Sequence, residues 1–359
     1  MSRVRKLSMP TVYQKDADIL KCAQDFSRLL AVGAEAIWYN AAMKDFDYLS
    51  LGFVSNDHLA VLPYLPVDTK VRMLSHAILG GGPAGNAAAG AATLGLRTAF
   101  VGTVGDDADG RMILEEFARE GVDTSMVAVR KGATSAIAYL WIEEKTGARS
   151  CAWTREGLDE LTADEITPAI ADAIRRAKVL HLDGHNAAGA IAAAKVAKAA
   201  GVTVMYDAGT IRAGMDEILP LADLLICSGE FAVSVAAGKD ALITTGYTEA
   251  EVEAAVRALY AKYRPMVCGA TMGVKGSMCF DGANLVKCPS FPVEKVVDTT
   301  GCGDLFHTGF AVRWLETHDL LDCQRFGAAV SAIKCRGLSG RPPSAPTRAE
   351  VEAFLAARP

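Results

Sequence analysis

The chain has 359 residues, too many for one small module, and this length suggests two domains or one large domain with insertions. Its 37 Lys and Arg against 42 Asp and Glu give a formal charge of −5, without a long basic run, which argues against a nucleic-acid-binding protein. Apolar residues make up 51% and charged residues 22%, a balance typical of a globular, enzyme-like chain rather than a disordered or fibrous one.

The cysteines and the apolar runs indicate a cellular setting. Nine cysteines occur without a CxxC pair or metal-ligand spacing, which favours reduced thiols in the cytoplasm. The basic start at residues 1–6 leads into no apolar stretch, so we expect no signal peptide. The most apolar long segment, Ala187–Met205, contains Lys195 and Lys198, so we expect no membrane span and a cytoplasmic protein.

The first part of the chain differs in pattern from the rest. Residues 12–45 carry apolar side chains three and four positions apart, as on one face of a helix. We therefore expect a helical N-terminal extension over residues 1–46, followed by a single domain over residues 47–359.

From Phe46 onward, short apolar runs alternate with helical segments. The strands are expected at Tyr48–Val54, Thr98–Val104, Val179–Asp183, Val202–Asp207, Leu221–Cys227 and Met266–Thr271. The helices between them are expected near 107–121, 163–176, 187–200, 248–263, 304–317 and 322–336. This alternation predicts an α/β fold with a doubly wound, mainly parallel sheet.

Two segments depart from the alternation, at about residues 58–79 and 134–154. Neither is flanked by a crossover helix, and both have the residue pattern of antiparallel strands. We expect them to pair as a small antiparallel β lid over the main sheet.

The strongest motif is the heptapeptide Asp298-Thr299-Thr300-Gly301-Cys302-Gly303-Asp304, between the strand-like Val293–Val297 and a helical segment. Its glycine amides and the positive end of the following helix favour an anion such as a phosphate. Asp304 would then accept a proton from an attacking hydroxyl, as in a kinase. Taken alone, the motif can also be read as an N-capping Asp after a flexible turn.

A second glycine-rich loop covers Gly80-Gly81-Gly82-Pro83-Ala84-Gly85-Asn86 and precedes a helix at Ala87–Leu94. Exposed glycine backbone suits the close approach of a polyhydroxyl ligand, and the Asn86 amide both donates and accepts hydrogen bonds. By itself the loop is equally explained by tight packing of the helix on the sheet.

Together the two motifs resemble those of the ribokinase-like (PfkB) carbohydrate kinase family, Gly-Gly-x-x-x-Asn and Asp-Thr-x-Gly-Ala-Gly-Asp, in the correct order. The resemblance runs from about Asp47 to Leu355 and implies a ribokinase-like fold that binds ATP and Mg²⁺. It implies that Asp304 is the catalytic base. The amides of Gly301, Cys302, Gly303 and Asp304 would form the anion hole.

The resemblance also implies where the ligands bind. Sugar hydroxyls would contact Asp57, Gly81, Gly82, Asn86, Asp183 and His185. The nucleotide turn would include Thr271, Gly273 and Gly276. Glu230 would face Mg²⁺, and Asp298 would help hold a monovalent cation such as K⁺.

Three departures from the family pattern matter. Cys302 replaces the usual Ala and adds an oxidisable thiol beside the phosphate site. In the Asn-x-x-Glu magnesium motif, only Glu230 is retained. Asp57 and Lys70, with the Gly-Gly-Gly-Pro-Ala and Lys-Cys-Arg segments, are similar to the sulfofructose kinase and ketohexokinase-like branches, although His185 stands where an arginine would contact a sulfonate.

We therefore expect an ATP-dependent sugar kinase that acts on a ketose or related sugar. A nucleoside kinase of the same family is the nearest alternative, and a non-catalytic sugar or nucleotide sensor on the kinase fold is the other. The apolar lid strands favour a homodimer.

Overall fold

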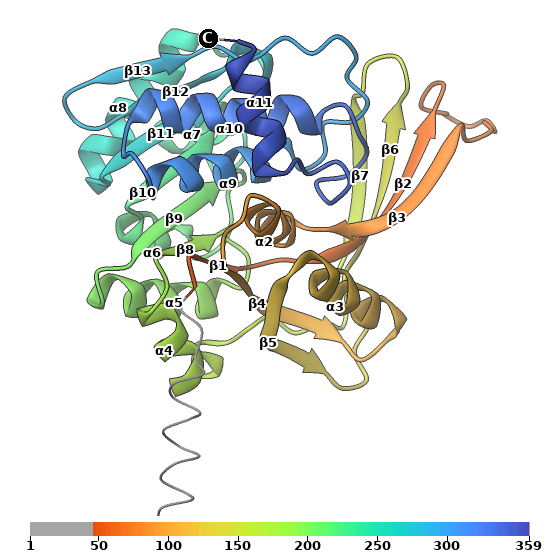
Figure 1. Ribbon diagram of the computed structural model, residues 1–359, viewed down its shortest axis with the longest axis horizontal. Helices are drawn as coiled ribbons and strands as arrows, with labels where there is room; N and C mark the ends of the chain where they lie inside the picture. Colours follow the sequence, from red (N-terminus) through yellow and green to blue (C-terminus); the bar gives the residue numbers. More distant parts are fainter. Residues whose placement is uncertain (1–45, 359) are drawn as a thin grey trace, which may run out of the picture. The chain divides into compact units, whose positions relative to one another are not determined.

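The computed structural model describes residues 46–358. Apart from Phe46, the predicted helical extension over residues 1–46 lies outside the described residues. A nine-stranded sheet forms the centre of the described domain, in the order β13-β12-β11-β10-β9-β8-β1-β4-β5 (Figure 1). Its strands are β1 (Tyr48–Leu51), β4 (Thr98–Gly105), β5 (Val122–Arg130), β8 (Val179–Leu182), β9 (Thr203–Ala208), β10 (Leu224–Ser228), β11 (Val267–Thr271), β12 (Ser277–Phe280) and β13 (Leu285–Cys288).

The main sheet is parallel from β5 to β11, and only β12 and β13 at one edge are antiparallel. This confirms the predicted doubly wound sheet and all six predicted strands. Three strands, β5, β12 and β13, were not predicted. Most side chains of β5 are only partly buried, and β12 and β13 have four residues each. None of the three strands therefore gives the long apolar run on which the prediction depended.

Helices cover both faces of the sheet. Apolar side chains of α2, α9 and α10 pack on one face, and those of α4, α5, α7 and α8 pack on the other. The helices are α2 (Pro83–Thr93), α3 (Ala108–Glu120), α4 (Pro168–Arg175), α5 (Ala187–Ala199), α6 (Met215–Ile218), α7 (Gly229–Ala236), α8 (Glu249–Tyr263), α9 (Cys302–Trp314), α10 (Leu320–Lys334) and α11 (Arg348–Ala356). The two faces carry separate clusters of fully buried apolar side chains, as the doubly wound arrangement requires.

A second sheet projects from the carboxyl end of the main one (Figure 1). It has the order β3-β2-β6-β7, with β2 (Ser55–Leu62), β3 (Ser75–Gly81), β6 (Ile137–Glu143) and β7 (Arg149–Thr154). This confirms the predicted lid, but β2 pairs with β6 in parallel, so the lid sheet is mixed. The reason is that β2 and β6 continue from the carboxyl ends of β1 and β5, which belong to the same parallel sheet.

Two local predictions need correction. Val293–Val297 forms no strand: the segment between Cys288 and Thr299 is irregular. Two prolines, Pro289 and Pro292, interrupt it, and proline supplies no amide hydrogen to a sheet. The helix expected at Ala87–Leu94 begins at Pro83, which places Asn86 in the first turn of α2 instead of in the preceding loop.

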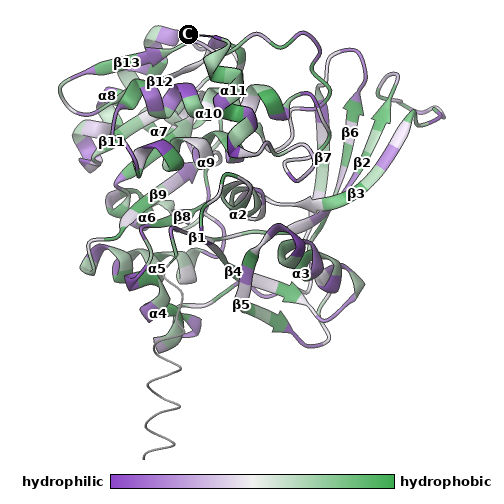
Figure 2. Ribbon diagram, viewed as in Figure 1, coloured by the Kyte–Doolittle hydropathy of each residue, from purple (hydrophilic) through white to green (hydrophobic). Residues whose placement is uncertain are grey.

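The strands of the main sheet are predominantly apolar, whereas polar residues gather on the outer helices and loops (Figure 2). Within the described residues, no helix is long and apolar enough to cross a membrane.

Candidate active site

The predicted anion hole is a tight turn at the start of α9. Gly301 caps the helix with a φ of 77°, a left-handed conformation that side chains rarely adopt. A Cβ added there would lie 2.5 Å from the Cα of Gly340, so only glycine fits. The amides of Cys302, Gly303 and Asp304 follow in the first turn of α9, where helical amides lack intrahelical acceptors and favour an anion. The Cys302 amide also donates to the carbonyl oxygen of Thr299, at the longer distance of 3.3 Å.

Asp304 lies in this first turn and faces the glycine-rich loop at the start of α2. The side-chain amide of Asn86 donates a hydrogen bond of 2.8 Å to its Oδ2 atom. The loss of hydration, with the nearby negative charge of Asp207, raises the pKa of Asp304 to about 7, although the bond from Asn86 opposes this shift. The structure thus brings the two predicted motifs into contact and gives Asp304 a pKa suited to a general base near neutral pH.

Asp207 and His307 are site residues that the sequence analysis did not assign. Asp207 is the penultimate residue of β9, and its Oδ2 lies 3.2 Å from Nδ1 of His307 on α9. The same ring nitrogen lies 2.7 Å from the carbonyl oxygen of Gly303, and Nε2 lies 3.1 Å from that of Ile226. The buried imidazole therefore ties the first turn of α9 to the carboxyl end of β9 and to the middle of β10. The signal for Asp207 was its place at the carboxyl end of a predicted strand.

On the sugar side, Asp57 lies against the glycine-rich loop. A Cβ on Gly81 would come within 2.1 Å of the Asp57 carboxylate, so the glycine permits this approach. The hydroxyl of Ser55 donates to Asp57 Oδ1 over 2.7 Å. Burial raises the pKa of Asp57 to about 6. Together these contacts make a buried acidic group beside glycine backbone that carries no side chain.

Asp183, the other predicted sugar-facing carboxylate, binds backbone amides from three segments. Its Oδ2 accepts hydrogen bonds from the amides of Phe53 (2.9 Å) and Ala84 (3.1 Å), and its Oδ1 accepts one from His185 (2.9 Å). Asp183 therefore joins the ends of β1 and β8 to the start of α2. This role in shaping the cleft was not evident from its spacing in the sequence.

His185 belongs to an aromatic cluster at the same end of the cleft. Its ring stacks on Phe53 with centroids 4.6 Å apart and meets the edge of Trp153, a lid residue, at 5.9 Å. Burial, with the charges of Arg212 and Arg155, lowers the pKa of His185 to about 3, so the ring is neutral at physiological pH. The cluster offers flat apolar surface next to Asp183.

Lys70 lies apart from these residues. It is exposed in the loop between β2 and β3, where residues 63–74 cross the distal end of the lid. Asp57 pairs with Leu79 near the base of the lid. Within the described chain, the fold does not bring Lys70 to the sugar side of the cleft.

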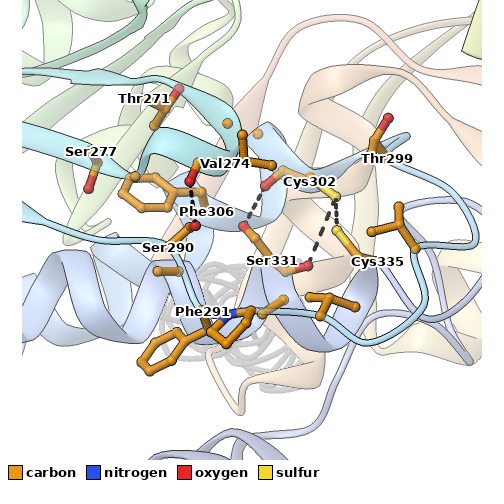
Figure 3. A pocket seen from close by; sticks show the side chains of 18 residues that line it. Thr271, Val274, Ser277, Ser290, Phe291, Thr299, Cys302, Phe306, Ser331 and Cys335 are labelled. Carbon is orange, nitrogen blue, oxygen red and sulfur yellow. Dashed lines mark hydrogen bonds between the residues drawn. The ribbon is translucent and has the colours of Figure 1, made fainter. Parts of the chain in front are cut away.

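A cavity of about 520 Å³ lies on the other side of the anion hole (Figure 3). The predicted nucleotide residues Thr271, Gly273 and Gly276 line it together with Cys302 and Gly303. Its remaining wall is mostly apolar, which suits an adenine ring. It is formed by Val274, Ser277, Ser290, Phe291, Pro292, Val293, Val296, Thr299, Phe306, Ala328, Ser331, Ala332 and Cys335.

Glu230, the predicted magnesium ligand, lies in the first turn of α7, at the carboxyl end of β10. Its Oε1 accepts a hydrogen bond of 2.6 Å from the hydroxyl of Tyr247. Cys227, at the place of the family's asparagine, is buried and donates to the carbonyl of Gly269, so it offers no oxygen ligand. No cluster of three metal-ligating side chains occurs among residues 46–358. A single carboxylate still fits Mg²⁺, which commonly binds one or two carboxylates, phosphates and waters.

Asp298 does not fit the expected monovalent cation. Its Oδ1 accepts from the amide and hydroxyl of Thr300, and its Oδ2 accepts from the amide of Ser339. The ammonium of Lys334 donates to the carbonyl oxygen of Asp298 over 2.7 Å and lies 3.5 Å from Oδ2. Both side chains are fully buried. A lysine ammonium from α10 therefore already supplies the positive charge beside this carboxylate.

Arg149 is a further residue that the sequence analysis missed. It begins β7 of the lid, and its Nη1 donates a hydrogen bond of 3.0 Å to the hydroxyl of Thr299. Arg149 also lowers the pKa values of Asp57 and Asp304, although burial outweighs it at both carboxylates. The lid thus places a cation against the anion hole, a contact between residues 150 positions apart in the sequence.

Comparison with known proteins agrees with this geometry. Residues 51–348 match the pfkB family of carbohydrate kinases. The chain is 28% identical over 309 residues to a ribokinase from Haemophilus influenzae, covering 85% of this chain and 97% of the relative. It is 26% identical to the ketohexokinase of Mus musculus, over 83% of this chain and 98% of that one.

The fold agrees equally well with a solved structure. A ribokinase from Arabidopsis thaliana, complexed with ribose and ATP, is 25% identical and superimposes with a TM-score of 0.72. The match covers 87% of this chain and 99% of that chain. The chain therefore belongs to the pfkB family of carbohydrate kinases and is an ATP-dependent phosphotransferase that acts on a sugar hydroxyl.

Proposed function

We propose that this kinase phosphorylates a ketose or a closely related sugar, with Asp304 as the base. The observation that carries the proposal is the contact of Asn86 with Asp304 beside the amides of residues 301–304. This contact places a carboxylate of raised pKa between the glycine-rich loop and the amides at the start of α9. The ketohexokinase relative supports the ketose class.

The substrate hydroxyl would bind against Asp304 and lose its proton to Oδ1 or Oδ2 as it attacks the γ-phosphorus. The charge that develops on the phosphoryl oxygens would be stabilised by the helix amides of residues 302–304 and by Arg149. The Asp207–His307 contact holds the turn that carries these amides. Mg²⁺, held through Glu230, would neutralise charge on the ATP phosphates.

The sugar itself would bind between the glycine-rich loop and the lid. Asp57 and Asn86 would bond its hydroxyls, and the backbone of Gly81 and Gly82 would let the ring approach closely. Asp183 would orient this loop through its bonds to backbone amides, leaving little of its carboxylate free for the sugar. His185 would provide an apolar wall for the far end of the substrate.

Lys334 would take the place of a monovalent cation behind the anion hole. Its ammonium lies on Asp298, at the start of the turn that carries the catalytic amides. No step of the proposed reaction requires K⁺.

The outer face of the lid supports a homodimer. On β6, the buried Ala138, Leu140 and Ile142 alternate with Tyr139 and Trp141, which are 48% and 38% exposed. Exposed aromatic side chains along one strand favour burial against a second copy of the lid. A monomeric mass by light scattering would contradict this part of the proposal.

A nucleoside is the second candidate substrate. The aromatic cluster of Phe53, Trp153 and His185 offers a surface on which a base could stack. This cluster lies next to Asp183, so base stacking and sugar binding would use neighbouring parts of one cleft.

The deciding experiment is a substrate panel. ADP formation would be measured with Mg²⁺ against ketoses, aldoses, nucleosides, and sulfonated or phosphorylated sugars, and the product position assigned by phosphorus NMR. We expect the highest kcat/KM for a ketose or a derivative of one. A nucleoside as best substrate would favour the second candidate. ATP binding without turnover on any compound would favour a sensor instead.

A further inference from the structure

Two cysteines that are 33 residues apart in sequence meet in the nucleotide cavity. The sulfur atoms of Cys302 and Cys335 lie 3.2 Å apart, one in the first turn of α9 and the other at the end of α10 (Figure 3). Both side chains are half-buried, and both line the cavity that also includes Gly303. Among the described residues, no other pair of cysteine sulfurs is in hydrogen-bond contact: Cys151 is exposed on the lid, and the remaining thiols are buried.

We propose that Cys302 and Cys335 form an oxidation site, at which a hydroperoxide converts the thiol pair into a disulfide that blocks the kinase reversibly. The inference rests on the proposed function only in taking this cavity as the ATP site. A disulfide bond is about 2.0 Å long, so the sulfur atoms must approach by about 1.2 Å from a contact that already exists.

The chemistry balances with the hydroperoxide as the sole oxidant. The sulfur of Cys335 attacks a peroxide oxygen, the O–O bond breaks, and a sulfenic acid forms with release of water or an alcohol. The thiol of Cys302 then displaces the sulfenic oxygen as water, and the S–S bond forms. The two sulfur atoms lose two electrons in total, and the peroxide gains them. A dithiol reverses the reaction by exchange.

The surroundings favour Cys335 as the attacking sulfur. The hydrogen bond with the Cys302 thiol, and then the charge of Lys334, lower the pKa of Cys335 to about 7 despite its partial burial. A larger thiolate fraction at neutral pH speeds the attack on a peroxide. Cys151 is exposed as a residue, but partial desolvation of its thiol and the charge of Asp57 raise its pKa. It also has no thiol partner among the described residues.

The disulfide would act on catalysis through the backbone of Cys302. Its amide belongs to the anion hole, and its carbonyl oxygen accepts a bond of 2.7 Å from the hydroxyl of Ser331 on α10 (Figure 3). A new covalent link to Cys335 pulls on this turn, and a shift of about 1 Å in a catalytic group can cost about a hundredfold in rate. The link also narrows the cavity between α9 and α10.

The test uses the full-length protein, reduced, freed of reductant and treated with hydrogen peroxide at graded concentrations. Peptide mapping by mass spectrometry should find a Cys302–Cys335 cross-link with the loss of two hydrogens. Turnover should fall by about tenfold or more in step with the cross-link and return after dithiothreitol. Saturating ATP should slow the cross-link, because the nucleotide would cover both sulfurs.

The two test variants are Cys302→Ala and Cys335→Ser, and Cys151→Ser is the matched control. The activity of each variant after peroxide is compared with the activity of the same variant before oxidation. We expect the first two to retain most of their activity under peroxide and the control to be inactivated like the wild type. Absence of the cross-link, or a cross-link without loss of turnover, would overturn the proposal. Peptide mapping detects the cross-link whether or not the protein turns over a substrate. A cross-link that forms equally fast with ATP would therefore count against this cavity as the ATP site and not against the thiol pair.

Discussion

The loop at residues 298–304 and the lid border the same cleft but are built in opposite ways. The loop rests on a buried polar network, in which Asp298, Lys334 and Ser339 have no exposed surface. The lid is a four-stranded sheet with one open face, and β7 is exposed along its whole length. The proposed reacting groups thus lie on a buried part of the molecule, and the lid that would enclose the substrate lies on an exposed part.

This difference predicts that substitutions in the loop and in the lid have unequal effects on turnover. Changes in the loop disturb groups that must be held within a fraction of an ångström, whereas changes in the lid affect how well the cleft closes. Loop variants should therefore change turnover by orders of magnitude, and lid variants by much less.

Asp304→Asn should have the largest effect. The variant keeps the shape and the contact with Asn86 but cannot accept the proton, so turnover should fall by about a thousandfold with ATP binding retained. Steady-state kinetics and ATP titration would measure this. Asp240→Asn, at an exposed loop position, is the control and should stay within about twofold. Near-normal turnover of Asp304→Asn would eliminate Asp304 as the base.

The raised pKa of Asp304 adds two pH signatures. Since the base must be ionised, kcat/KM of the wild type should rise with pH through about 7. In the folded chain Asp304 holds its proton to higher pH than in the unfolded chain, so its stabilising contribution is lost as the pH rises from about 4 to about 7. Asp304→Asn should therefore melt above the wild type, by a margin that is wider at pH 8 than at pH 5. An equal margin at both pH values would contradict the shift.

Gly301→Ala should reduce turnover by about a hundredfold and also lower the melting temperature, because its Cβ meets Gly340 in a left-handed turn. Gly303→Ala is the matched comparison, since a Cβ there has no neighbour within 4 Å. It should melt like the wild type and act mainly through the KM for ATP. Thermal unfolding and steady-state kinetics of both variants would distinguish an effect on stability from an effect on ATP binding. Equal melting temperatures of Gly301→Ala and Gly303→Ala would argue against strain at Gly301.

Arg149→Ala tests the lid. It removes a charged donor from Thr299 and should lower kcat by about tenfold, whereas Arg149→Lys should lose less because it keeps the charge. Arg119→Ala, an exposed arginine on α3, serves as the control. A loss as large as that of Asp304→Asn would break the contrast between loop and lid.

The smallest expected effect is that of the monovalent cation on the activity of the wild type. If the ammonium of Lys334 replaces a monovalent cation, wild-type activity should agree within about twofold in potassium and choline chloride at equal ionic strength. Lys334→Ala removes the charge beside Asp298 and should make activity depend on K⁺. Strong activation of the wild type by K⁺ would show that the lysine does not fill this role.

Much of the fold followed from local pattern. Apolar runs such as Leu221–Cys227 identified the buried parallel strands, and the heptapeptide at 298–304 predicted the turn that precedes α9. The strand predicted at Val293–Val297 failed because its valines line the nucleotide cavity or pack on helices without pairing. The half-exposed β5 and the short β12 gave too weak a pattern to predict.

The sequence by itself determined the family motifs, the doubly wound sheet and the choice of Asp304 as the candidate base, since each depends on residues that lie near one another in the sequence. Only the tertiary structure decided which distant groups meet: Asn86 with Asp304, Lys334 with Asp298, and Cys302 with Cys335. The first contact depends on the packing of α2 near α9, and the other two depend on the packing of α10 against α9 and the turn before it. Periodicity along the sequence carries no record of that packing, because it reports the buried side of each element and not the neighbour that buries it.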